Sequence, residues 1–197
     1  ALAFRDHVVP FQQCGTRLFT LPQLAAHYAE VRYFTDRGGE PVRERIVSAM
    51  MALLGRYREV DLFLLTHGTP YCVWFAALPR RLRGRLRLVY NTGCGGTREW
   101  PLWRALGARA YVAHPGALSL SPFFYFYFLR RWNGGLPLWR AVPEANARVA
   151  RLFSLGSILL AGAFDGAAWE RETRAVVFGD AALHLGSVPV APAGEPR

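Results

Sequence analysis

A thiol and an imidazole each follow an apolar run in this sequence. Cys94 comes after residues 86–90 through the turn Asn-Thr-Gly, and His67 comes after residues 62–65 through a single threonine. Both runs are typical of buried strands. If the two strands are neighbours, the side chains that follow them meet at one edge of the sheet, about 4.8 Å apart in strand spacing. A cysteine beside a histidine predicts acyl transfer by a thiol nucleophile and its proton acceptor.

Glycine next to each of these residues favours the same chemistry. Gly68 follows His67 directly, and Gly93 and Gly95 flank Cys94. A residue without a side chain lets a backbone N–H approach a developing oxyanion. We therefore expect the amides of Gly68 and Cys94 to form the oxyanion hole.

The elements that position these residues alternate along the chain, which predicts an α/β fold. The strands are apolar at nearly every position, as in a mostly parallel sheet with helices on both faces. We expect a single domain over residues 1–187 and a frayed Pro/Gly/Ala tail over 188–197. The expected strands are 31–35, 60–65, 86–90, 109–113 and 175–178, and the expected helices are 23–30, 41–57, 70–78, 100–106, 118–132 and 138–153.

Composition sets wider limits. The 197 residues are 52% hydrophobic and 19% charged, which excludes a disordered chain. The formal charge is +10 and all 24 basic residues are arginine, which indicates compositional bias more than selection at each site. The densest basic run, residues 79–87, contains no stacking aromatics and is expected to be a helix end and strand entry. No apolar stretch reaches the ~20 residues that a bilayer span needs. Neither nucleic acid nor membrane is an expected partner.

Four stretches together resemble the caspase-like cysteine peptidases, the superfamily of caspases, legumain, gingipains, separase and the bacterial caspase-like domains found beside helical repeats. One stretch is the strand Asp-Leu-Phe-Leu-Leu-Thr ending in His67-Gly68, and another is the strand Leu-Arg-Leu-Val-Tyr-Asn-Thr-Gly ending in Cys94. The stretch at 107–113 is similar to the strand after the nucleophile, and 177–183 is similar to the ending of gingipain-like members. The match spans about residues 31–185, and the fold's first strand would lie within 2–11.

The resemblance implies a three-layer caspase-like sandwich and a cysteine endopeptidase with His67 as base, Cys94 as nucleophile and Gly68 as oxyanion donor. Its substrate would be a protein or peptide, and the reaction needs no cofactor or metal. Asp36 and His114, at the ends of their strands, are candidates to contact the substrate. Other domains or a regulatory partner are expected, since the chain starts at Ala1 without methionine. The compartment stays open, with the cytoplasm favoured.

Alternative interpretations remain for the same residues. A caspase-like scaffold without activity would bind a partner through the aromatic run Phe-Phe-Tyr-Phe-Tyr-Phe at 123–128, which otherwise predicts a buried helix. A binder of nucleic acid or anionic lipid would use the basic run. A zinc site would need four ligands without a compact pair, and the remaining thiols are expected in the core. Those four ligands would be Cys72, Cys94, His67 and His114.

Overall fold

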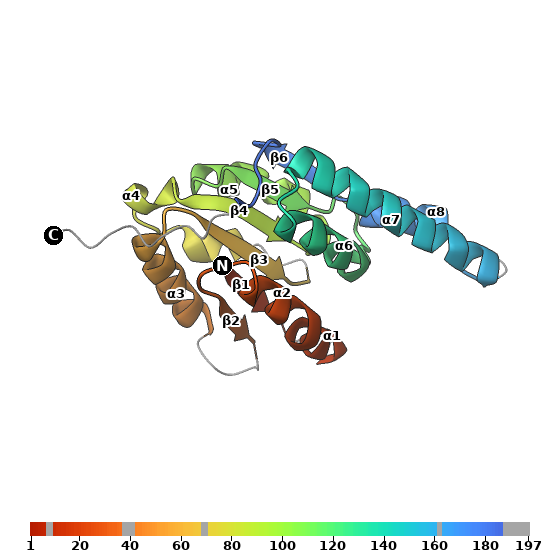
Figure 1. Ribbon diagram of the computed structural model, residues 1–197, viewed down its shortest axis with the longest axis horizontal. Helices are drawn as coiled ribbons and strands as arrows, with labels where there is room; N and C mark the ends of the chain where they lie inside the picture. The colour runs from red at the N-terminus through yellow and green to blue at the C-terminus, as the bar shows by residue number, and fades with distance from the viewer. Residues whose placement is uncertain (7–9, 37–41, 68–70, 161–162, 187–197) are drawn as a thin grey trace.

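A six-stranded sheet organises the molecule in the order β2-β1-β3-β4-β5-β6 (Figure 1). The computed structural model describes residues 1–6, 10–36, 42–67, 71–160 and 163–186. The first five strands are parallel to one another, and β6 runs antiparallel to β5. The strands are β1 (Leu2–Arg5), β2 (Arg32–Thr35), β3 (Val60–Leu65), β4 (Leu86–Asn91), β5 (Ala110–Ala113) and β6 (Val176–Gly179).

Helices cover both faces of this sheet. One face carries α1 (Pro10–Gly15), the π-helix η1 (Thr16–Thr20), α2 (Leu21–Ala25), α6 (Ser121–Asn133), α7 (Leu138–Leu159) and α8 (Gly166–Thr173). The other carries α3 (Val42–Arg56), the 3₁₀ helices η2 (Tyr71–Phe75) and η3 (Gly96–Glu99), α4 (Arg80–Arg83) and α5 (Trp100–Ala105). Figure 1 shows α6 and α7 on one side of the sheet and α3 on the other. The predicted α/β class and three-layer arrangement are therefore confirmed.

The continuous hydrophobicity of the strands follows from this double cover. Phe63 and Leu65 of β3 pack in the cluster under α6 and α7. Leu62 and Leu64, which point the opposite way, pack in the cluster under α3. Successive strand residues alternate between faces, so a strand with two buried faces is apolar at each position.

The N-terminal region differs most from the sequence prediction. The expected strand within residues 2–11 is only four residues long and ends at Arg5, and helix α1 begins at Pro10. Proline suits the first turn of a helix because its missing N–H would have no partner there. The short helix predicted at 23–30 ends earlier, at Ala25.

At the other end of the chain, α7 continues six residues beyond the predicted Phe153, and α8 was not predicted. Asp165 caps α8 by accepting a hydrogen bond from the Ala168 amide at 2.9 Å. The predicted tail at 188–197 lies outside the described residues.

Candidate active site

The two predicted dyad residues follow neighbouring parallel strands at equivalent positions. Leu64 of β3 pairs with Asn91 of β4. His67 lies three residues beyond Leu64, and Cys94 lies three residues beyond Asn91. The strand ends are joined beyond the sheet by Thr92, whose amide donates to the Leu64 carbonyl at 2.9 Å and whose hydroxyl accepts from the Thr66 amide at 2.7 Å. The structure therefore brings His67 and Cys94 to the same edge of adjacent strands.

A carboxylate that the sequence analysis did not identify holds His67. The Asp6 side chain accepts a hydrogen bond from the His67 backbone N–H at 2.6 Å and lies 3.0 Å from the Nδ1 atom of the ring. A carboxylate only accepts, so this contact places the ring proton on Nδ1 and leaves Nε2 as the basic nitrogen. No described residue is hydrogen-bonded to Nε2. The His67 side chain is 33% exposed, whereas that of Asp6 is 5% exposed.

Asp6 directly follows β1, which lies between β2 and β3 in the sheet. Arg5 pairs with Leu65, so Asp6 is level with Thr66, one residue before His67 on the neighbouring strand. The signal for this residue was present, because an acidic residue after an apolar strand at the carboxyl edge is a candidate site residue. It was missed because the strand was expected to continue past it.

The turn that carries Cys94 is fixed by hydrogen bonds on both sides. The Asn91 side chain accepts from the Gly93 amide at 2.8 Å, and the Gly95 amide donates to the Gly116 carbonyl at 2.7 Å. Gly95 has a φ of 64°, a left-handed conformation that favours glycine. These contacts leave Cys94 half-buried, and its own amide donates to no acceptor among the described residues.

The loop after β5 covers the sulfur from one side. The Ser119 amide donates to Cys94 Sγ at 3.4 Å. Two hydroxyls in this region, Ser119 Oγ and Thr66 Oγ1, are buried without a hydrogen-bond partner in the part of the chain that the structure describes. Buried polar atoms of this kind are uncommon in folded proteins and mark places where a ligand or water can bond.

The next two predicted residues are Gly68, the expected oxyanion donor, and Asp36, a candidate substrate contact. Gly68 lies outside the described residues. Asp36 follows β2 at the same sheet edge as Asp6, and its amide donates to the Arg5 carbonyl at 3.1 Å. It is three strands from Cys94, or about 14 Å at the usual strand spacing, so its contact with a substrate remains a prediction.

The prediction for His114 needs correction. The residue is fully buried, stacked edge-on against Phe124, with Nδ1 2.6 Å from the Thr173 carbonyl and Nε2 3.1 Å from the Tyr90 hydroxyl. Both ring nitrogens are occupied, and desolvation lowers its pKa to about 4. The side chain that was expected to line the substrate cleft is a neutral core residue, because the chain after β5 turns under α6.

The structure also shows where the other two thiols lie and bears on the zinc hypothesis. Cys72 is buried as predicted, but Cys14 is exposed and is not a core thiol. Cys72 packs in the cluster under α3, whereas His114 contacts Phe124 on the opposite face of the sheet. No group of three metal-ligating side chains occurs among the described residues.

The basic run is largely used within the fold. Arg83 donates to the carbonyls of Leu78, Ala76 and Ala105, and Arg85 donates to that of Leu54. Arg80 and Arg81 are both exposed at the start of α4. In the described residues no helix has the length and hydropathy of a membrane span.

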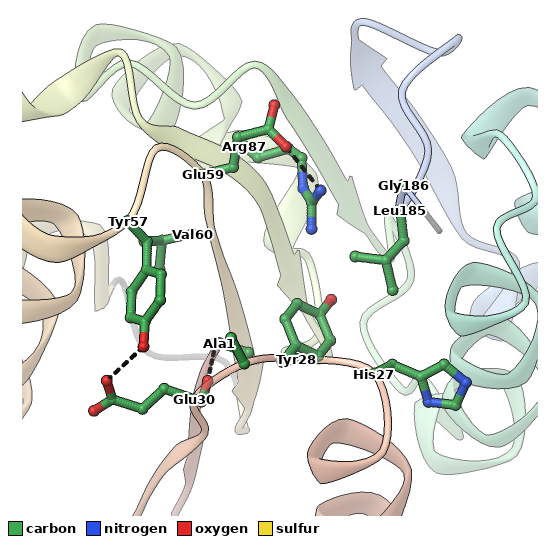
Figure 2. Close-up of a pocket in the computed structure, with 11 residues that line it drawn as sticks. Ala1, His27, Tyr28, Glu30, Tyr57, Glu59, Val60, Arg87, Leu185 and Gly186 are labelled. Carbon is green, nitrogen blue, oxygen red and sulfur yellow. Dashed lines mark hydrogen bonds and ion pairs between the residues drawn. The ribbon is translucent and has the colours of Figure 1, made fainter. Parts of the chain in front are cut away.

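A small cavity of about 80 Å³ lies at the opposite edge of the sheet, where β3 and β4 begin. Figure 2 shows Arg87 bonded to Glu59 and Tyr57 bonded to Glu30 around it. Arg87 also forms two hydrogen bonds of 2.8 Å with Asp61, which is fully buried. The polar groups here satisfy one another, so this cavity is part of a structural network and not the candidate site.

Comparisons of the chain with protein-family models, with curated proteins and with solved structures found no match.

Proposed function

We propose that this chain is a cysteine endopeptidase of the caspase-like type, in which Asp6, His67 and Cys94 act together. The observation that carries the proposal is the Asp6–His67 hydrogen bond beside a cysteine at the matching position of the next strand. A base oriented by a carboxylate and placed near a nucleophile is the arrangement that thiol and serine acyl transfer share. The order of motifs along the chain, which resembles that superfamily, supports the same assignment.

The reaction would proceed in two halves. His67 Nε2 takes the proton of the Cys94 thiol, and the sulfur attacks the peptide carbonyl carbon while the oxygen becomes an oxyanion. The amide of Cys94, which has no acceptor among the described residues, is a donor for that oxyanion. The C–N bond then breaks, and the leaving amine takes the proton from His67.

In the second half, a water molecule gives its proton to His67 and attacks the thioester carbon. The C–S bond breaks, and Cys94 leaves and is reprotonated. Asp6 orients the ring throughout and stabilises the imidazolium that forms after each proton transfer. Its burial favours this role, since an enclosed carboxylate holds a fixed direction more effectively than an exposed one.

The test is a peptide-library digest with the wild-type chain and its Cys94→Ala and His67→Ala variants. The exposed thiol of Cys14 provides a matched control, because Cys14→Ala also removes a thiol but leaves Asp6, His67 and Cys94 in place. We expect cleavage by wild type and Cys14→Ala, and a loss of at least about 10³-fold in both dyad variants. Equal cleavage by Cys94→Ala would overturn the mechanism, and a wild-type chain that cleaves no peptide in the library would overturn the proposed activity.

A further inference from the structure

A cleft lies on the face of the sheet covered by α6. Its volume is about 390 Å³, and α1, η1 and α2 form one wall while α6 forms the other. This volume falls within the roughly 300–1,000 Å³ range of small-molecule sites. The lining includes Arg5 at the floor, and Thr16, Phe19, Tyr125, Phe126 and Leu129.

The aromatic run that forms one wall is only partly in the core. Phe124 and Phe128 are fully buried, as predicted for this helix. Phe123 and Phe126 are 46% and 40% exposed and line the cleft. On the facing wall, Phe19 is 59% exposed. Exposed aromatic side chains on both sides of one cleft offer an apolar molecule a place to bury surface.

Arg5 gives this cleft a charge. The residue is 4% exposed, yet its guanidinium bonds only to neutral side chains among the described residues: Thr16 Oγ1 at 3.0 Å and Gln12 Oε1 at 2.7 Å. No ion pair joins Arg5 to a carboxylate in the described part of the chain. Desolvation lowers the pKa of Arg5 from its usual value. The neighbouring Asp6 carboxylate raises that pKa and so offsets part of the desolvation, and an anion bound directly to the guanidinium would stabilise the charge further.

A second polar group, the hydroxyl of Tyr125, lines the cleft near Thr20. Tyr125 is 4% exposed and lines the cleft, and its hydroxyl has no hydrogen-bond partner among the described residues. A phenol can donate to an oxygen that a guanidinium also contacts. Arg5 and Tyr125 therefore provide donors for one anionic group at the end of an apolar cleft.

We propose that this cleft binds an amphipathic monocarboxylate, with its carboxylate on Arg5 and Tyr125 and its hydrocarbon chain between α6 and η1. A single buried arginine matches one negative charge, and its planar fork matches a carboxylate. The apolar walls exclude a ligand that is polar throughout. The site is separate from the thiol chemistry, so its test does not depend on peptidase activity.

The experiment is isothermal titration calorimetry with decanoate, decanol and decylamine as probes, on the wild-type chain. We expect decanoate to bind more tightly than decanol by about 10- to 100-fold, the range of a charge-assisted hydrogen bond, and decylamine to bind more weakly than decanol. Arg5→Gln should abolish the preference for decanoate over decanol. Arg148→Gln, on the exposed side of α7 and outside the residues that line the cleft, is the matched control and should keep it.

Tyr125→Phe provides a second variant in case Arg5→Gln does not fold, and it should weaken decanoate binding without changing decanol binding. Equal affinity for decanoate and decanol would overturn the assignment, as would the absence of decanoate binding to wild type. Cys94→Ala should bind decanoate like the wild type, so a failure of the proposed peptidase activity and a failure of this site are distinguishable.

Discussion

Asp6 contacts His67 twice, through the backbone N–H at 2.6 Å and the ring Nδ1 at 3.0 Å. The first contact fixes the backbone where it leaves β3, and the second fixes the plane and tautomer of the imidazole. One buried carboxylate thus controls both the position and the protonation of the proposed base.

Replacing this carboxylate should impair catalysis more than folding. Asp6→Asn keeps the size of the side chain, but its NH₂ group can donate to Nδ1 and move the ring proton to Nε2. We expect kcat/KM on the best library peptide to fall about 10²- to 10⁴-fold. The Tm and the urea midpoint check that the variant is folded. A folded Asp6→Asn chain with wild-type kcat/KM would remove Asp6 from the mechanism.

The three thiols should differ in their reaction with iodoacetamide at pH 7.5. Desolvation raises the pKa of Cys72 to about 11, so its thiolate fraction is roughly 100-fold or more below that of an ordinary exposed thiol. We expect Cys94 to be alkylated fastest, exposed Cys14 next and Cys72 slowest, as measured by mass spectrometry of peptides over time. In His67→Ala the rate at Cys94 should fall to that of Cys14 or below. If Cys94 reacts no faster than Cys14 in the wild type, His67 does not activate the thiol.

The sequence predicted the class of the fold and two of the three residues of the candidate site, because those features depend on local pattern. Apolar runs identified β3 and β4, and His67 and Cys94, which follow these strands, lie at the same edge because parallel neighbours end there. Asp6 depends on where a four-residue strand stops. A short strand gives little periodicity, and strand ends are the least certain part of such a prediction.

The failure at His114 has a different cause. It follows a strand at the same edge as His67 and Cys94, so the local sequence pattern predicts a site position for His114 as strongly as for those two residues. Its burial is decided by α6 and by Thr173, which is 59 residues away in the chain. Contacts between distant segments are not visible in a single sequence, and they decide which strand-end residues face solvent.

Burial of His114 also predicts a pH dependence of stability. Its folded-state pKa is about 4, below the unfolded value of about 6.5. Between these values the unfolded chain binds a proton that the folded chain does not, so stability is complete above about pH 6.5 and falls as the pH drops toward 4. By pH 4.5 this residue should cost about 2–3 kcal/mol of unfolding free energy.

Urea unfolding of wild type and His114→Gln at pH 7.5 and 4.5 checks this expectation. The variant will be less stable at pH 7.5 because it disturbs the bonds to Tyr90 and Thr173. The informative quantity is the loss between the two pH values, which should be smaller in His114→Gln by about 2–3 kcal/mol. Identical losses in both proteins would show that His114 does not titrate in this way.

The buried pair of Asp61 and Arg87 should dominate the electrostatic stability of the sheet. Asp61 is fully buried and also accepts hydrogen bonds from Tyr28 at 2.5 Å and Trp132 at 3.2 Å. Asp61→Asn leaves the Arg87 guanidinium, which is 5% exposed, without its buried counter-charge. We expect a loss of about 3–5 kcal/mol in unfolding free energy, measured by urea denaturation at pH 7.5.

The matched comparison is Glu170→Gln, which removes the exposed pair with Arg174 on α8 and should cost no more than about 0.5 kcal/mol. The double variant Asp61→Leu/Arg87→Met tests the cause. Removing both charges leaves no unpaired ion, and Trp132 can still donate to the Tyr28 hydroxyl, as it does at 2.9 Å. The double variant should therefore be more stable than Asp61→Asn. A double variant that is no more stable than Asp61→Asn would mean that packing, and not the unpaired charge, sets the cost of the substitution.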